Sequence, residues 1–330
     1  MIRIHEKCHF LTSYGVHCTS NIFLYVSHRT SSLLLRCMKK AFIQLHIAVL
    51  FAGFTAILGR LINLNEWILV WYRMLLSAAS LAIILFFRKE LTRISFLNIM
   101  KIFGVGTIVA LHWVTFYGSI KYSNVSVSVT CLSAIGFFTS LFEPVIMKRT
   151  IDWVEVLLGL LAIAGIYLIF NFYPEYKTGI IFGIISTMLA SLFPVFNKNL
   201  LTKFSPKEVT LFEMTGGFIA LCIIVPFYLR FFPASYYLPT FSDWVWLLIL
   251  AWICTVLSFI LQLNALRMIS AFTANLTYNL EPVYAIILAF IIFRENKFLG
   301  PGFYMGFSLI LLAVSLQMMR VWNDRKLQSL

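Results

Sequence analysis

The stretch SDWVWLLILAWICTVLSFILQLNAL, residues 242–266, determines the fold class. Beyond Asp243 it holds no charged residue, and it is long enough to cross the hydrocarbon core of a bilayer, which takes about 20 apolar residues as a helix. The run is continuously apolar and does not alternate, which is typical of a helix and not of a strand in a membrane barrel. Similar runs fill most of the chain and predict ten spans, at approximately residues 41–62, 67–87, 99–120, 124–147, 152–172, 178–197, 208–230, 242–266, 270–293 and 301–320. We therefore predict an all-α integral membrane protein with ten transmembrane helices.

The composition agrees with this prediction. Hydrophobic residues make up 61% of the 330 residues and charged residues 12%, and the mean hydropathy is +0.90. A soluble protein of this length needs more polar residues to cover its surface. The gaps between the runs are short, so a soluble catalytic domain has no room. The lipid bilayer is therefore the expected surrounding of most of the chain.

The net charge of +13 would suggest a nucleic-acid partner in a soluble protein. Here the positive residues gather in one set of loops. With a cytoplasmic amino end, the expected inside segments from residue 36 onward hold sixteen Lys and Arg, and the outside segments with their edges hold six. Positive residues collect in cytoplasmic loops of membrane proteins. We therefore expect no nucleic-acid partner, both termini in the cytoplasm, and a bacterial plasma (inner) membrane as the location.

The sequence gives little support to catalysis or to a cofactor. Its six cysteines contain no C-x2-C pair, and neither a G-x4-G-K-[ST] loop nor a G-x-S-x-G elbow occurs. All three aspartates, Asp152, Asp243 and Asp324, lie at or beyond the ends of spans, which argues against paired intramembrane aspartates. We expect no enzyme activity, no cofactor and no metal.

The order of spans and breaks repeats along the chain. An offset of 146 positions places Lys121 on Arg267 and Lys148 on Arg294. We predict two repeats of five helices, residues 38–176 and 177–320, and a cytoplasmic tail, residues 321–330. Five is an odd number, so the second repeat enters the membrane from the opposite side, which is a common plan of secondary transporters. Residues 1–37 are expected to be a disordered extension or a mis-called start before Met38, with an organelle transit peptide as the alternative.

Several motifs resemble one family. They are His112-Trp113-x3-Tyr117-Gly118-Ser119-Ile120, Asn264-Ala265-Leu266, Asn279-Leu280-Glu281-Pro282-Val283-Tyr284 followed by Phe293-Arg294-Glu295, and Arg73 after Trp71-Tyr72. Together they are similar to the EamA group of the drug/metabolite transporter superfamily, over about residues 41–320. The resemblance implies two five-helix repeats and transport of small metabolites; the family moves amino acids, sugars and nucleotide derivatives. In one departure, the first repeat has Lys148-Arg149 where the second has Arg294-Glu295.

Polar side chains inside the spans are the candidates for substrate binding. A charge at the bilayer centre costs at least about 2.5–3.5 kcal/mol, so it should face a cavity or a partner. Glu281 lies near the middle of the ninth span, and Asn275, Tyr278 and Pro282 share a helix face by their spacing. The ten candidates are Glu281, Tyr278, Asn275 and Asn279 in the ninth span, Trp113, Tyr117 and His112 in the third, Gln262 and Asn264 in the eighth, and Arg73 in the second.

Other polar residues receive structural interpretations. Glu143 lies close to Lys148 and Arg149, and we expect it to pair with one of them. Arg73 and Glu213 lie five or six residues into their spans, and side chains so placed by default extend toward the membrane interface. Gly179-x3-Gly183 and Gly302-x3-Gly306 are expected to let helices pack closely, within the chain or in a homodimer.

The predicted function is secondary active transport of small metabolites by alternating access, with neutral or zwitterionic substrates such as amino acids. A nucleotide-sugar or sugar-phosphate exchanger of the same superfamily is the alternative within transport. A channel or a lipid flippase is the alternative outside it. The expected partners are a small-molecule substrate and the bilayer; a coupling ion or proton and a homodimer are left open.

Overall fold

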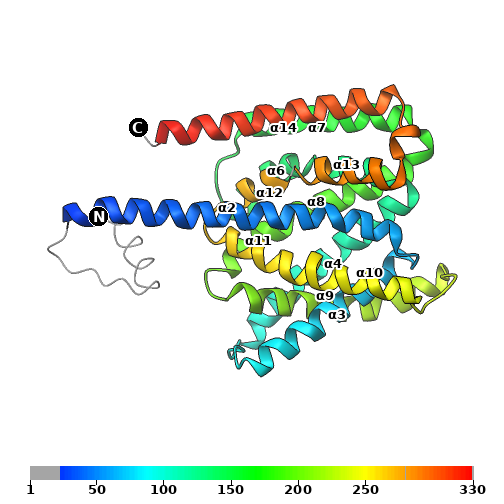
Figure 1. Cartoon of the computed structure of the whole chain (residues 1–330), viewed down its shortest axis with the longest axis horizontal. Coiled ribbons are helices and arrows are strands. Elements are labelled where there is room, and N and C mark those ends of the chain that lie inside the picture. The colour runs from blue at the N-terminus through cyan, green and yellow to red at the C-terminus, as the bar shows by residue number, and fades with distance from the viewer. Residues whose placement is uncertain (1–22, 279, 329–330) are drawn as a thin grey trace. The chain divides into compact units, whose positions relative to one another are not determined.

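The computed structural model describes residues 23–278 and 280–328, and of residues 23–37, 272, 275, 276 and 321–328 it describes the backbone alone. Every regular element in this part of the chain is helical (Figure 1). The contacts divide the chain into two units, residues 1–40 and 41–330. In the first unit, residues 23–40 are helical. The domain prediction for residues 1–37 therefore stays a prediction.

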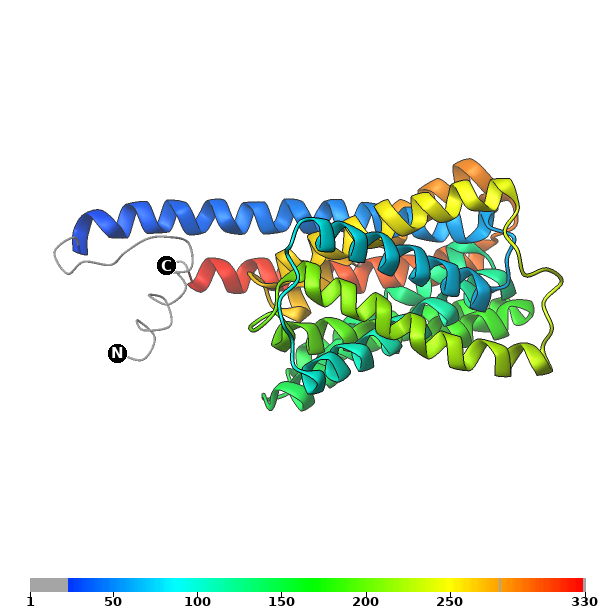
Figure 2. The ribbon, with the colours of Figure 1, turned by 90° about the horizontal axis from the view of Figure 1, so that it is seen from below.

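The second unit is a helical bundle whose members mostly run along one common direction (Figures 1 and 2). Its first helix is the later part of α2, which as a whole covers Phe23–Leu61. The following elements are α3 (Glu66–Phe87), α4 (Phe96–Tyr122), α5 (Val125–Leu132), α6 (Ile135–Met147), α7 (Trp153–Phe172), η1 (Pro174–Tyr176), α8 (Lys177–Leu200), α9 (Pro206–Phe231), α10 (Phe241–Ala251), the π-helical turn η2 (Trp252–Leu257), α11 (Ser258–Leu266), α12 (Ala271–Tyr278), α13 (Glu281–Phe293), η3 (Glu295–Lys297) and α14 (Pro301–Gln328).

The predicted spans are found in this order. Within the described residues, nine helical segments are long and apolar enough to cross a membrane. The predicted ninth span, residues 270–293, is divided into the shorter helices α12 and α13. The prediction of an all-α membrane protein is confirmed, with this span broken rather than continuous.

The fourth and ninth spans are broken at equivalent places. α5 and α12 begin 146 positions apart, and so do α6 and α13. α6 and α13 each end before a residue with left-handed backbone, Lys148 with φ 53° and Arg294 with φ 54°. In the ninth span Pro282 follows the break at the start of α13, where the missing N–H of proline is tolerated. α5 packs against α13 and α6 against α12, so the two broken spans lie across each other.

Two cations at equivalent positions make equivalent contacts. Lys121, in the last turn of α4, donates through Nζ to the carbonyl of Leu64, just after α2. Arg267, just after α11, donates through Nη2 to the carbonyl of Phe204, just after α8, at 3.0 Å. These are the positions that the offset of 146 aligns. The recurrence of both the breaks and these contacts supports the two-repeat organisation.

Glycines set the closest helix contacts. α7 and α14 lie side by side (Figure 1). A Cβ atom on Gly165 would lie 2.6 Å from the carbonyl oxygen of Gly306, and one on Gly306 would lie 2.5 Å from that of Gly165. Gly179 and Gly302 likewise approach Ser123 and Phe172. The packing role expected of Gly179 and Gly302 is therefore found within the chain.

Candidate functional site

A cavity of about 70 Å³ lies among the middle parts of the helices, and both halves of the chain line it. Six of the ten predicted substrate-binding residues reach it: Arg73, His112, Trp113, Gln262, Tyr278 and Glu281. The remaining lining residues are Ala52, Thr55, Phe116, Leu132, Ile135, Ala190, Phe193, Cys254, Ser258 and Phe259. We call this the central cavity. One of the lining residues, Ser258, donates its hydroxyl to the carbonyl of Ala48, 210 positions earlier in the sequence, at 3.2 Å.

Arg73 is the cation of the central cavity. Its Nη1 donates to the hydroxyl of Tyr117 and its Nε to the hydroxyl of Thr255, both at 2.7 Å. Its guanidinium carbon lies 3.4 Å from the ring centre of Trp113, where the negative face of the ring attracts a cation. Only 1% of the residue is exposed, so the expectation that Arg73 extends to the interface is wrong. Partners from α4 and η2 satisfy the guanidinium inside the bundle, which removes the reason to reach for water.

Glu281 is the acidic residue of the same cavity. It is the first residue of α13 and 8% exposed. The unpaired N–H groups at the start of a helix favour a negative charge there. Neither Glu281 nor Arg73 belongs to any of the ion pairs found among the described residues. The cavity is therefore lined by one basic and one acidic side chain that form no direct ion pair.

His112 is held in place by α8. Its Nδ1 lies 2.9 Å from both the carbonyl oxygen and the hydroxyl of Ser186, and that hydroxyl lies 3.1 Å from the His112 carbonyl. The imidazole also lies beside Phe193, with ring centres 5.9 Å apart and the two ring planes tilted by 44°. Phe193 and Trp113 both contact Phe259, at 5.9 and 5.8 Å. One wall of the cavity is therefore aromatic.

The other candidates lie elsewhere. Tyr117 is fully buried and fixes Arg73 without lining the cavity. Asn264 is half-buried on α11 and does not line it. The side chain of Asn275 and the whole of Asn279 lie outside the described residues, so their predicted roles stay predictions. Sequence reasoning passed over Thr55 and Ser258, because single hydroxyl residues are common in membrane helices and give no distinctive pattern.

Two other predictions concern residues outside the cavity. Glu143 pairs with Arg149 at 4.0 Å, which confirms its structural interpretation. Residues 5–9, HEKCH, have the H-E-x-x-H spacing of a zinc-binding helix, and this pattern runs against the expectation of no metal. Those residues lie outside the described part of the chain.

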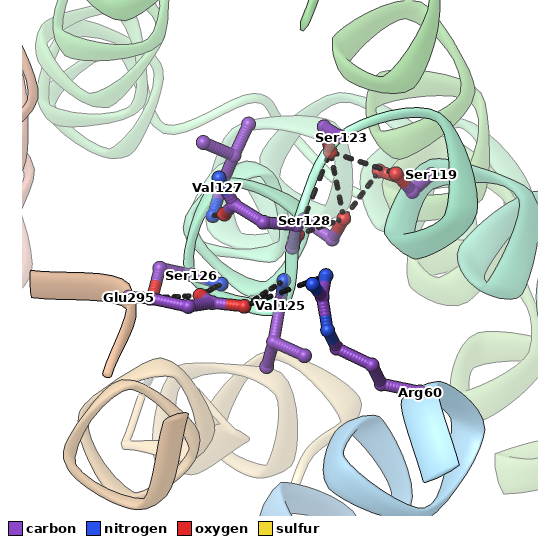
Figure 3. Close-up of polar contacts among 9 residues, drawn as sticks. Arg60, Ser119, Ser123, Val125, Ser126, Val127, Ser128 and Glu295 are labelled. Carbon is purple, nitrogen blue, oxygen red and sulfur yellow. Dashed lines mark hydrogen bonds and ion pairs between the residues drawn. The ribbon is translucent and has the colours of Figure 1, made fainter. Parts of the chain in front are cut away.

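A polar cluster ties the far end of α13 to the first repeat (Figure 3). Glu295 accepts hydrogen bonds from the backbone N–H of Val125 at 3.1 Å and from the N–H and hydroxyl of Ser126 at 2.8 and 2.6 Å. Arg60, at the end of α2, lies 3.7 Å from the same carboxylate and over the ring of Phe293. A carboxylate at the first N–H groups of a helix satisfies donors that the helix itself leaves free. The cluster therefore joins α2, α5 and η3.

Membrane-length helices around a central cavity with polar and aromatic lining define a polytopic α-helical membrane protein. A model described as the EamA-like transporter family matches residues 39–171 and again 177–319. The chain therefore belongs to the EamA-like transporter family, and the two matches correspond to the two repeats.

The relatives agree with this assignment. Two proteins of Archaeoglobus fulgidus, each named an uncharacterized transporter, are similar to the chain. One is 28% identical over 153 residues, which cover 46% of this chain and 53% of that protein. The other is 26% identical over 192 residues, which cover 57% and 68%. The first match thus spans about half the length of that relative.

A solved structure titled "Crystal structure of protein" has the same fold. The TM-score is 0.61 at 14% identity, over 84% of this chain and 96% of that one. At this identity the likeness concerns the fold alone.

Proposed function

We propose that the protein is a secondary transporter that moves small zwitterionic metabolites, such as amino acids, by alternating access of two inverted halves. The observation that carries the proposal is the central cavity, which is lined by the guanidinium of Arg73 and the carboxyl of Glu281. A zwitterion matches this arrangement, because Arg73 can bind its carboxylate and Glu281 its ammonium group. The aromatic wall at Phe193 and Phe259 then accommodates an apolar side chain.

The size of the cavity supports a closed conformation. Its volume of about 70 Å³ is well below the roughly 300–1,000 Å³ of pockets that bury drug-sized ligands. A metabolite therefore needs helices to move apart before it enters or leaves. In inverted-repeat transporters such movement exchanges the conformations of the two halves. The crossed broken spans, α5–α6 and α12–α13, supply cavity residues from each half.

Phosphorylated substrates fit the same cavity less well. Among its lining residues Arg73 is the one basic side chain that is charged at every physiological pH, and Glu281 opposes a second negative group. A sugar phosphate or a nucleotide sugar brings two negative charges and favours several cations. The charge bias between loops supports two cytoplasmic termini, and an inner-membrane location remains part of the proposal.

The test is counterflow in proteoliposomes. Vesicles are preloaded with pooled unlabelled amino acids, and the entry of a labelled mixture at trace level is followed. Accumulation that depends on the preload is expected for the wild-type protein. It should fall at least tenfold in Glu281→Gln and in Arg73→Met, and it should persist in Asn264→Ala, whose side chain lies off the cavity.

The outcomes separate the two parts of the proposal. Normal counterflow in Glu281→Gln shows that the substrate site lies elsewhere. No counterflow in a wild-type protein shown to be folded and inserted rejects amino acids, and the assay is then repeated with sugar phosphates. Flux that never saturates indicates a channel instead of a carrier.

A further inference from the structure

Glu213 is one of several acidic residues that are buried outside the central cavity. Glu213 lies on α9 with 0% of its surface exposed, and neither carboxyl oxygen has a hydrogen-bond partner among the described residues. Asn197 on α8 is also 0% exposed, and both of its amide atoms lack such a partner. Asn197 is the polar side chain near the Glu213 carboxyl, but the two form no hydrogen bond in this conformation. The two therefore form an isolated polar pair, and the expectation that Glu213 extends to the membrane interface is wrong.

Close packing explains why Glu213 stays inside. A Cβ atom on Gly106 of α4 would lie 2.1 Å from the carbonyl oxygen of Glu213, and one on Gly217 would lie 2.7 Å from the carbonyl oxygen of Gly106. The backbones of α4 and α9 thus touch at this level. A long side chain has no gap there through which to reach water.

No cation among the described residues neutralises Glu213 in this conformation. α9 packs on α3, α4 and α11, and Asn197 brings α8 to the pair. α11 has no ionisable side chain. Those of the other three helices are Glu66, Tyr72 and Arg73 on α3, Lys101, His112, Tyr117, Lys121 and Tyr122 on α4, and Lys177 and Lys198 on α8. On α9 itself they are Lys207, Glu208, Cys222, Tyr228 and Arg230.

The buried cations among them are engaged elsewhere. Arg73 bonds Tyr117, and Lys198 donates to the carbonyls of Leu266 and Ile269 at 2.5 and 2.6 Å. Lys101 is exposed at the end of α4. A charged carboxylate without a cation or a donor is strongly disfavoured in an apolar interior. The carboxyl of Glu213 therefore carries a proton in this closed conformation.

Asn197 lies on the part of α8 that runs from the central cavity to a groove at the end of this helix. Asn197 is one helical turn beyond Phe193, which lines the central cavity. Phe196, the residue before Asn197, lines a groove of about 690 Å³ between the ends of α4 and α8. Val105, the neighbour of Gly106, lines the same groove. A separation of α8 from α4 at this level would widen this groove and bring water to Glu213.

We propose that Glu213, with Asn197, is a proton-binding site that couples substrate movement to a proton gradient. The carboxyl O–H is intact while the helices are packed. When they separate, it releases its proton to water, and the carboxylate is stabilised by water and by the Asn197 amide. The inference rests on the proposed transport function, but the proton site can be tested without a substrate.

The first test is infrared absorption of the full chain in lipid. A band of a protonated carboxyl is expected near neutral pH, and it should lose intensity in Glu213→Gln. Glu281→Gln is the matched control, because it removes a different buried carboxyl and should leave the Glu213 contribution in place. An unchanged spectrum in Glu213→Gln overturns the proposal. If that variant does not fold, the spectrum of Glu281→Gln decides: a persisting band supports the site and its absence rejects it.

The second test uses the labelled amino-acid mixture in vesicles with an imposed pH gradient. One proton per zwitterion and a gradient of one pH unit allow about tenfold accumulation. We expect this response in the wild type and in Asn264→Ala. In Glu213→Gln the ratio of accumulation with the gradient to that without it should fall to about one, and Glu213→Asp should restore part of it. Accumulation that follows a sodium gradient, or a full pH response in Glu213→Gln, refutes the inference. Absence of wild-type counterflow rejects the proposed substrate class, and the infrared result still judges the proton site.

Discussion

Glu295 offers a sharp test of how the two repeats are joined. Its carboxylate is 3% exposed and accepts three hydrogen bonds, from the N–H groups of Val125 and Ser126 and from the Ser126 hydroxyl (Figure 3). Glu295→Ala removes the acceptor and leaves all three donors without a partner. Glu295→Gln keeps one oxygen acceptor and removes the charge.

The size of the effect follows from these contacts. A hydrogen bond to a charged group contributes about 1.5–3 kcal/mol, and removing one partner of a buried charged contact typically destabilises by about 3–5 kcal/mol. We expect Glu295→Ala to lower the free energy of unfolding by that amount. Glu295→Gln should lower it by roughly half as much, because the charge at the start of α5 is lost while one acceptor remains. Arg60→Ala should change it by less than about 1 kcal/mol, because the side chain of Arg60 is 41% exposed.

The assay is denaturant unfolding in mixed micelles of fixed composition, followed by tryptophan fluorescence. Arg149→Ala is the matched control. Arg149 occupies the position 146 residues before Glu295, its side chain is 67% exposed, and it pairs with Glu143 at 4.0 Å. It should cost less than about 1 kcal/mol. Equal losses for Glu295→Ala and Arg149→Ala would show that burial and the α5 contact do not stabilise the fold as argued.

Three further predictions concern stability and insertion. Gly106→Ala should destabilise the protein by at least about 1–3 kcal/mol, because the added Cβ would meet backbone at 2.1 Å. Gly104→Ala is the control: its Cβ would have nothing within 4 Å, and it should be neutral or stabilising by up to about 1 kcal/mol. Equal shifts in the melting temperature of the two variants would contradict the packing argument. The hydrogen bond from Arg320 lowers the pKa of Asp152 below 3.8. The contribution of the Asp152 carboxylate to stability is therefore complete above pH 3.8 and is lost as pH falls through the lower folded pKa. The difference in stability between wild type and Asp152→Asn should shrink below pH ~4 and stay under about 1 kcal/mol. Deletion of residues 2–37 should leave insertion and orientation unchanged, which cysteine labelling of the loops measures; loss of insertion would contradict the prediction that the membrane bundle begins after them.

Much of the architecture could be read from the sequence because its cause is local. Whether a segment crosses a membrane depends on the hydropathy of some twenty consecutive residues, and runs such as 242–266 decide that by themselves. The repeat was visible for a related reason: Lys121 and Arg267 keep equivalent places at the ends of spans, and their contacts proved equivalent. Arg73 and Glu281 could be selected as cavity candidates because a charge within a span needs a special environment.

A shared dipeptide does not mark equivalent positions in the two repeats. Glu143-Pro144 and Glu281-Pro282 share their letters, but Ile135 is the residue that begins α6 as Glu281 begins α13. The carboxyl at the cavity is therefore contributed by the second half of the chain alone. The two dipeptides lie at different positions within their helices, and the dipeptide alone does not reveal those positions.

The tertiary structure alone decided which polar groups are buried and with whom. A span sequence gives the depth of a side chain but not the direction it faces, so Arg73 and Glu213 had the same default of reaching for the interface. In the packed bundle their surroundings differ. Arg73 donates hydrogen bonds to Tyr117 and Thr255, whereas Glu213 lies near Asn197 and the backbone contact at Gly106. Glu295 likewise meets residues 169 and 170 positions away. Hydropathy along the chain fixes which segments enter the bilayer, whereas contacts between segments depend on how the helices turn and cross, and these are set only when all of them pack together.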